Sequence, residues 1–145
     1  MAKPFETVSA EAWPDRRTFS PAVRVGNLLF LSGTTATDEG GEIVGRGDIV
    51  AQTRQIYRKF AALLAAAGAG LENIVATTEY VTTTDNYRQT AAVRREVFGG
   101  PPYPTATGVI VAGLLREGTL IEISAVAVLP DATRPAAAAG TLEAP

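Results

Sequence analysis

The chain has 145 residues, 46% of them hydrophobic, which suits a single domain with one buried core. Thirteen Lys and Arg against fifteen Asp and Glu give a formal charge of −2 without any basic run. This disfavours nucleic acid as a main partner, because phosphate binding needs a concentrated basic face. Since the sequence has no Cys and no His, disulfides, thiolate nucleophiles, imidazole bases and the most common nitrogen and sulfur metal ligands are excluded.

The N-terminal segment shows no regular pattern. Residues 1–18 mix Pro, Glu, Asp and Arg around Trp13 and follow neither a helical nor a strand period, so we predict an irregular N-terminal arm, with ordered structure from Phe19 onward. No apolar segment approaches the roughly 20 residues that span a bilayer, and the N-terminus lacks the apolar core of a secretory signal. We therefore expect a cytoplasmic protein with no membrane partner.

A β-hairpin is predicted early in the chain. Residues 22–25 and 28–32 flank the pair Gly26 and Asn27, which can adopt the positive φ angles that a two-residue hairpin turn demands. The second of these strands is apolar along nearly its whole length, which indicates burial on both faces. It ends at residues 32–34, where a glycine would let the backbone approach another group closely.

Two helices follow in the prediction. Asp48 is suited to cap the first helix, which extends to Ala67 and carries apolar residues at helical spacing on one face. The second helix begins at Thr84 or Asp85, whose side chains can accept hydrogen bonds from free helix amides, and continues to Val97. The Gly and Pro residues after it end this helix, because proline supplies no amide to continue the hydrogen bonding.

Three further strands are predicted at residues 73–83, 105–112 and 120–129, where β-branched residues are frequent. Alternation along the first of them places Ile74 and Glu79 on opposite faces.

The order of these elements predicts an α+β fold, a mixed β-sheet with both helices on one face. Such a sheet leaves its second face uncovered. Its strands carry more apolar surface than two helices can hide, so we expect self-association. Residues 131–145 are rich in Pro, Ala and Gly and are predicted to form a flexible C-terminal tail.

Several separated segments carry a resemblance to one known family. They are residues 23–33, 52–54, 74–81, 103–104 and 121–123. In this order they resemble the RidA (YjgF) family of reactive-intermediate deaminases, and the similarity covers residues 19–130. The resemblance implies a chorismate-mutase-like α+β subunit that forms a homotrimer, with the sheets closing a central barrel and a ligand cleft at each subunit interface.

The resemblance also implies a reaction. Active members hydrolyse 2-imino or 2-enamino acids to 2-keto acids and ammonia without metal or cofactor. In such a site an arginine binds the substrate carboxylate through two hydrogen bonds, backbone groups hold the nitrogen, and a glutamate positions the attacking water.

Some residues of the family's site are retained. Ser32 and Gly33 match the Ser-Gly pair that lines the cleft, and Glu122 matches the catalytic, water-positioning glutamate. The family's arginine lies two residues after the proline of its Pro-x-Arg motif. In this chain that place is taken by Ala106.

Other substrate-binding positions depart from the family's pattern. Phe19 stands where many members have Tyr, and Ala91 where many have Asn. Gly108 replaces a residue that is often Cys or Thr, and Ile110 replaces a Glu. A pocket altered in this way should prefer a more hydrophobic or differently shaped ligand, because a short imino acid would lose charge-assisted hydrogen bonds worth about 1.5–3 kcal/mol each.

The same residues also have structural interpretations. Ser32 and Gly33 can be a strand end with its turn, and Glu122 can be an exposed carboxylate on a solvated strand face. Thr105 and Thr107, which complete the substrate-binding set, are good strand residues in any case.

Four arginines are surface charges by default, although any one of them could replace the missing carboxylate clamp: Arg24, Arg94, Arg95 and Arg116.

Two functions from different classes follow. The first is a divergent deaminase of an enamine, imine or related small molecule, with Glu122 orienting water at a subunit-interface cleft. The second is a trimeric small-molecule-binding or regulatory protein without hydrolytic chemistry, which Ala91, Ala106 and Ile110 motivate. A ribonuclease, a label often attached to relatives, is disfavoured because the sequence has no basic face and no His.

Overall fold

The predicted hairpin is present. In the computed structural model, which describes residues 2–130, strands β2 (Ala22–Val25) and β3 (Leu28–Thr34) pair antiparallel, and Gly26 between them has a φ of 60°. A positive φ at this position is costly for a side chain with a Cβ, so glycine suits the turn. The C-terminal tail predicted at residues 131–145 lies outside the described residues.

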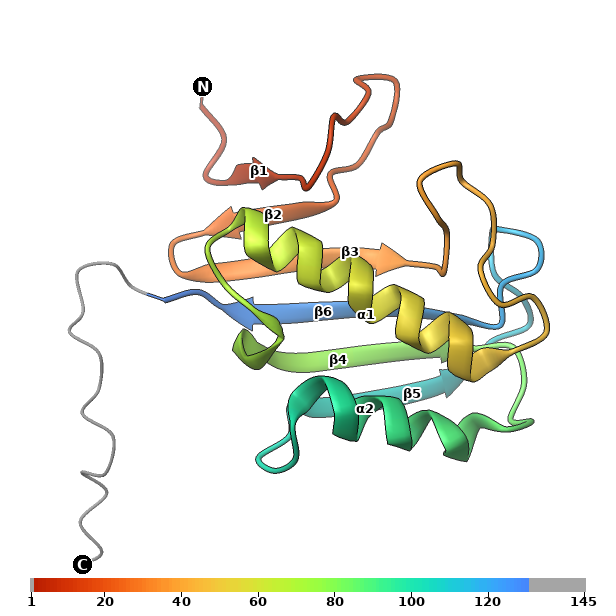
Figure 1. Cartoon of the computed structure of the whole chain (residues 1–145). Coiled ribbons are helices and arrows are strands. Elements are labelled where there is room, and N and C mark those ends of the chain that lie inside the picture. Colours follow the sequence, from red (N-terminus) through yellow and green to blue (C-terminus); the bar gives the residue numbers. More distant parts are fainter. Residues whose placement is uncertain (1, 131–145) are drawn as a thin grey trace, which may run out of the picture.

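The strands form one mixed sheet, and both helices lie on the same face of it (Figure 1). The remaining strands are β1 (Glu6–Val8), β4 (Ile74–Val81), β5 (Thr105–Ile110) and β6 (Ile121–Val128). The strand order is β1-β2-β3-β6-β4-β5, in which β4 and β5 are parallel and the other neighbours are antiparallel. The predicted α+β architecture is confirmed.

The arm of residues 1–18 is not irregular throughout. Glu6–Val8 forms β1 at the edge of the sheet and pairs antiparallel with β2. A strand of three residues is too short to show a period of two in the sequence, and its ladder depends on pairing with another strand, β2. The prediction missed it for this reason.

The first helix, α1 (Ile49–Ala66), follows from local signals. Asp48 caps it and accepts a hydrogen bond of 3.0 Å from the Ala51 amide. Its end is a Schellman motif, in which the amides of Gly68 and Ala69 donate to the carbonyls of Ala65 and Leu64.

The second helix, α2 (Thr90–Phe98), starts later than predicted. Neither Thr84 nor Asp85 caps it, because Asn86 takes a left-handed conformation and a 3-10 turn, η2 (Tyr87–Gln89), comes first. A second 3-10 turn, η1 (Leu71–Asn73), joins α1 to β4. Gly99, which has a φ of 71°, ends α2.

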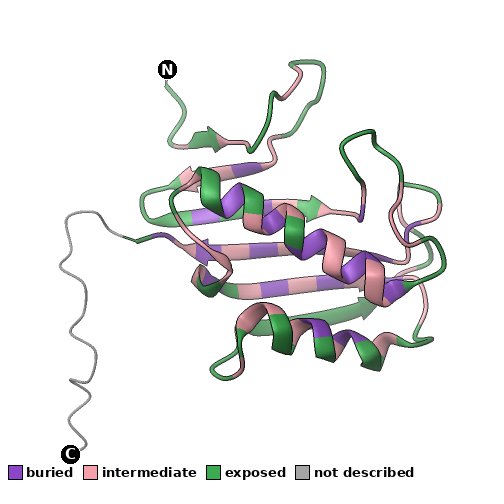
Figure 2. Cartoon of the chain, in the orientation of Figure 1, coloured by how far each residue is buried: buried purple, intermediate pink, exposed green. Residues whose placement is uncertain are grey.

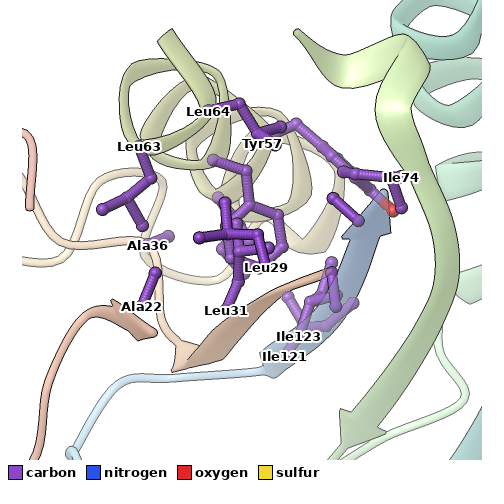
Figure 3. Close-up of a cluster of buried hydrophobic side chains, with 14 of the residues drawn as sticks. Ala22, Leu29, Leu31, Ala36, Tyr57, Leu63, Leu64, Ile74, Ile121 and Ile123 are labelled. Carbon is purple, nitrogen blue, oxygen red and sulfur yellow. The ribbon is translucent and has the colours of Figure 1, made fainter. Parts of the chain in front are cut away.

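The core lies between the helices and the face of the sheet that they cover (Figures 2 and 3). Its fully buried side chains include Leu29, Ile56, Phe60, Leu64, Ile121 and Ile123. Alternate residues of β3 point the other way, and Leu28 and Phe30 are 36% and 42% exposed. The expectation that this strand is buried on both faces is wrong for the single chain, because both helices pack on one side.

A bulge changes the faces of β4. Ile74 and Ala76 pair with adjacent residues of β6, so Val75 is an extra residue in the ladder. As a result Ile74 and Glu79 are both buried on the helix-covered face, against the predicted alternation.

Neither helix in residues 2–130 has the length and apolar character needed to cross a membrane.

Candidate functional site

The register of the sheet separates the candidate residues onto two faces. Ala106 pairs with the buried Thr77 and lies on the helix-covered face. Glu122 lies between the buried Ile121 and Ile123 in β6 and therefore points to the opposite face. Within one chain these two positions of the expected site cannot face a common ligand.

Glu122 belongs to a broad hollow of about 1220 Å³ at the end of β3, lined also by Phe19, Ser32 and Gly33. Its carboxylate rests against Gly33, and a Cβ at that position would lie 2.9 Å from Glu122 Oε1. The lack of a side chain at Gly33 therefore gives the carboxylate its room. The structure thus brings together the predicted catalytic residue, Glu122, and three of the predicted substrate-binding residues.

Ser32 has both of its donors engaged inside the protein. Its hydroxyl donates to the Ser20 carbonyl at 2.6 Å, and its amide donates to the Pro21 carbonyl at 2.9 Å. The neighbouring Phe19 carbonyl accepts a hydrogen bond of 2.7 Å from Trp13 Nε1. Ser32 is therefore suited to fixing the wall of the hollow rather than to donating its hydroxyl to a ligand.

Lys59 is a further member of this hollow that the sequence prediction did not select. Its ammonium donates to Thr34 Oγ1 at 2.6 Å, to the Thr35 carbonyl at 2.7 Å and to Thr37 Oγ1 at 2.8 Å. All three of its donors are engaged. In the sequence, the position of Lys59 beside the apolar stripe of α1 was the only sign that this lysine is partly buried. Its hydrogen-bond acceptors come from a different segment of the chain, residues 34–37.

Burial lowers the pKa of Lys59 to about 8, and the charge of Arg116 adds to the effect. Because the ordinary value is 10.5, the unfolded chain binds more protons than the folded chain between these two pH values. The free energy of unfolding should therefore gain a rising contribution from Lys59 as the pH increases from about 8 to about 10.5. Urea unfolding at a series of pH values should show this slope, and Lys59→Met should reduce it.

Lys3→Met supplies the matched control, because Lys3 is an exposed lysine. That variant should keep the slope of the wild type. An unchanged slope in Lys59→Met would show that Lys59 titrates normally.

A smaller pocket of about 220 Å³ lies beside Ala106, between β5 and α2. Its lining comprises Thr77, Ala91, Arg94, Arg95, Phe98, Tyr103, Pro104 and Ala106. The structure therefore brings Ala91 and Ala106 together, away from the hollow that holds Glu122. The two hollows share none of their lining residues.

The remaining candidates on β5 do not share one surface. Gly108 is on the helix-covered face, where an added Cβ would lie 3.3 Å from the Tyr87 hydroxyl. Thr105 and Thr107 point to the other face, and Thr105 Oγ1 donates to the Val75 carbonyl at 3.2 Å.

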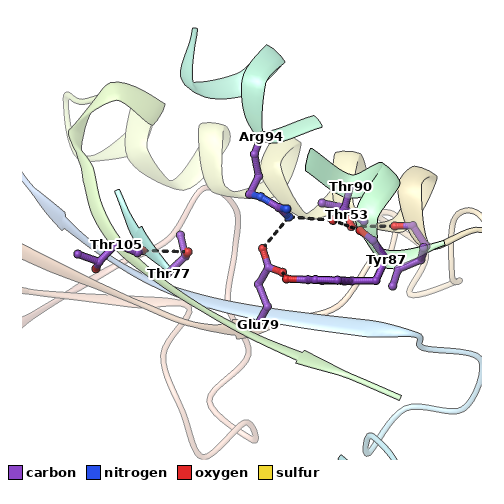
Figure 4. Close-up of polar contacts among 8 residues, drawn as sticks. Thr53, Thr77, Glu79, Tyr87, Thr90, Arg94 and Thr105 are labelled. Carbon is purple, nitrogen blue, oxygen red and sulfur yellow. Dashed lines mark hydrogen bonds and ion pairs between the residues drawn. The ribbon is translucent and has the colours of Figure 1, made fainter. Parts of the chain in front are cut away.

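A buried polar cluster supports the pocket beside Ala106 (Figure 4). Glu79 is 1% exposed and accepts hydrogen bonds from Arg94 Nη1 at 3.2 Å and from the Tyr87 hydroxyl at 2.6 Å. Arg94 Nη1 also donates to Thr90 Oγ1 at 2.8 Å. Burial and the bond to Glu79 raise the pKa of Tyr87 to about 12.

The default assignment of Arg94 to the protein surface is therefore wrong. Its side chain is only 23% exposed and forms an ion pair with a buried carboxylate. The sequence signal was Glu79 in a strand on the same face as the buried Val81, since a buried carboxylate needs a partner.

Arg94→Met should lower the free energy of unfolding by about 3 kcal/mol, because the variant leaves the buried Glu79 carboxylate without its charged partner. The double variant Glu79→Gln/Arg94→Met should lose less than the sum of the two single changes, with a coupling of about 1 kcal/mol or more. Urea unfolding of the four proteins measures this cycle.

The control is the pair Arg54–Glu96, whose side chains are 38% and 61% exposed. Arg54→Met should cost less than about 1 kcal/mol. Additive effects at Glu79 and Arg94 would contradict the inferred coupling.

Among residues 2–130, no group of three or more His, Cys, Asp and Glu side chains is arranged to hold a metal ion.

Comparisons with known proteins agree with this fold. The family model described as Endoribonuclease L-PSP matches residues 10–129. A RutC family protein of Pyrococcus horikoshii is 37% identical over 110 residues, which cover 75% of this chain and 85% of the relative. The RutC family protein YjgH of Escherichia coli is 35% identical over 114 residues, which cover 78% of this chain and 84% of the relative.

Among solved structures, RidA from the Antarctic bacterium Psychrobacter sp. PAMC 21119 has a TM-score of 0.76 and 28% sequence identity, with 86% of this chain and 99% of that chain covered. The family match over most of the chain and the shared fold show that this protein belongs to the RidA (YjgF) family, whose sequence model carries the description Endoribonuclease L-PSP.

Proposed function

We propose that the protein is a cofactor-independent hydrolytic deaminase of an imine, an enamine or a related small molecule. The observation that carries this proposal is the Glu122 carboxylate, which rests against Gly33 at the edge of a hollow large enough for a ligand. Membership of the RidA family supports it, because the resemblance to this family implies the hydrolysis of imino and enamino acids.

The chemistry needs only one base and one water. Glu122 accepts a proton as the water oxygen adds to the C=N carbon, and it returns a proton to the nitrogen. Glu122 then carries the proton of the newly formed hydroxyl group to the nitrogen as the C–N bond breaks, so that an imine and water give a ketone and ammonia. Neither a metal nor a cofactor is required for the balance of this reaction.

We further propose that the complete site forms between subunits of a homotrimer. Glu122 and Ala106 point to opposite faces of one sheet, so only a second chain can bring the two hollows together. The uncovered face also supports association, because Leu28, Phe30 and Val109 are exposed apolar side chains on it.

Glu122→Gln should lower the rate of ammonia release by about 100-fold or more, because the amide cannot act as a general base. Gly33→Ala should also lower the rate, since the new Cβ would displace the carboxylate from its position. The assay follows ammonia and keto-acid formation from 2-iminopropanoate and from larger enamines of the aminomuconate type.

Glu72→Gln is the control, because Glu72 is an exposed carboxylate outside both hollows. It should retain the rate of the wild type. Wild-type turnover that Glu122→Gln leaves unchanged would assign the reaction to another group.

Light scattering should give three times the chain mass of 15.1 kDa. Phe30→Glu should shift the protein toward smaller species, because it places a charge on the uncovered face. Ala92→Glu, on the exposed side of α2, should leave the mass unchanged. A monomer mass for the wild type would remove both the trimer and the interface site.

A small-molecule-binding protein without hydrolytic activity is the second candidate. Ala106 favours it, because a methyl group cannot supply the charge that binds a substrate carboxylate in active relatives. Absence of turnover with all of the substrates named above would favour this candidate. We propose no nucleic-acid partner, since the chain has a formal charge of −2 and no His.

A further inference from the structure

We propose that Arg94 and Arg95 form an anion-binding clamp in the pocket beside Ala106, and that this pocket takes a small carboxylate with a flat apolar body. The two arginines reach the pocket from α2, whereas Ala106 lies on β5. The methyl group of Ala106 leaves open the space that a longer side chain on this strand would fill.

The hydrogen bonds of Arg94 leave one edge of its guanidinium free. Nη1 donates to Glu79 and to Thr90, while Nε and Nη2 donate to no residue within 2–130. The Nε–Nη2 edge presents two parallel N–H groups, which is the geometry that binds both oxygens of a carboxylate. Because Glu79 already holds the group in place, little side-chain freedom is lost when a ligand binds.

Arg95 supplies the net positive charge of the clamp. Arg94 and Glu79 form a neutral pair, so Arg94 alone attracts an anion weakly. Arg95 lines the same pocket and forms no ion pair with any residue in the described part of the chain. Together the pair and Arg95 carry one positive charge, which matches a single carboxylate.

The rest of the lining determines the shape of the ligand. Phe98, Tyr103 and Pro104 provide an apolar wall, and Ala91 adds a small side chain. The Thr77 hydroxyl is engaged, because it donates to the Thr105 carbonyl at 3.2 Å. A volume of about 220 Å³ is below the range of drug-sized pockets, so the ligand is small.

The binding of a carboxylate here is independent of turnover. The role of Arg94 and Arg95 as the clamp for the substrate rests on the proposed deaminase function, in which a second chain would bring Glu122 to this pocket.

Calorimetric titration of the full chain with benzoate tests the site, with benzamide as the uncharged probe of the same shape. Benzoate should bind at least about tenfold more tightly than benzamide, because the uncharged amide of benzamide cannot form the charge-assisted pair with an arginine. Arg95→Gln should weaken benzoate binding by about tenfold, and Ala106→Leu should abolish it by filling the pocket.

Two further variants separate binding from folding. Arg94→Lys keeps a positive charge beside Glu79 but loses the two-nitrogen edge, so benzoate affinity should fall while the thermal midpoint stays close to that of the wild type. Arg88→Gln, an exposed arginine on η2 outside the pocket, should bind benzoate like the wild type.

Absence of benzoate binding to the wild type, or equal binding by the wild type, Arg95→Gln and Ala106→Leu, would overturn the clamp. Benzoate binding that depends on Arg95 in a protein without deaminase turnover would support the clamp and reject the proposed reaction. Deaminase turnover in a protein that shows no such benzoate binding would reject the clamp and support the proposed reaction.

Discussion

Successive side chains of a β-strand point to opposite faces of the sheet, and this constraint determines which residues of the protein can share a ligand. Ile121 and Ile123 pack under the helices, so Glu122 must point away from them. Ala106 pairs with Thr77 and must point toward them. The chain therefore carries two separate hollows, and the interface site that we propose would bring them together across two subunits.

The buried ion pair between Glu79 and Arg94 connects the fold to the smaller of these hollows, which Arg94 lines. A carboxylate that is 1% exposed is costly to bury unless its oxygens are paired, and here Arg94 and Tyr87 occupy both of them. The pair joins β4 to α2 and fixes the guanidinium at the wall of the pocket. The same interaction thus stabilises the packing of the helix and orients a group that can bind an anion.

Local signals made much of the fold predictable. The Gly26 turn and the Asp48 cap each act within a few residues, and both elements appear where the sequence indicates them. The edge strand β1 and the bulge at Val75 depend on pairing with other strands, so the local pattern could not show them. The late start of α2 follows from the left-handed conformation of Asn86 and the 3-10 turn after it.

The candidate site was also predictable only in part from the sequence. The family motif identified Ser32, Gly33 and Glu122 from the sequence, and the structure places these three residues together. The acceptors of Lys59 and the Glu79 partner of Arg94 come from other elements, so spacing within one helix does not identify them. The bond from Arg94 to Thr90, by contrast, follows helical spacing.

The position of the arginine changes what a pocket can select. An arginine on β5, as the family resemblance implies, would offer its full charge to a ligand. In this chain Glu79 neutralises Arg94, and Arg95 is exposed, so that solvent screens its charge. The electrostatic attraction for a short acid is therefore weaker. The apolar wall of Phe98, Tyr103 and Pro104 must contribute a larger share of the binding free energy, since each buried CH₂ group adds about 0.8 kcal/mol. Replacing a strand arginine by two helix arginines thus shifts selectivity from charge toward the size and shape of the apolar part of the ligand.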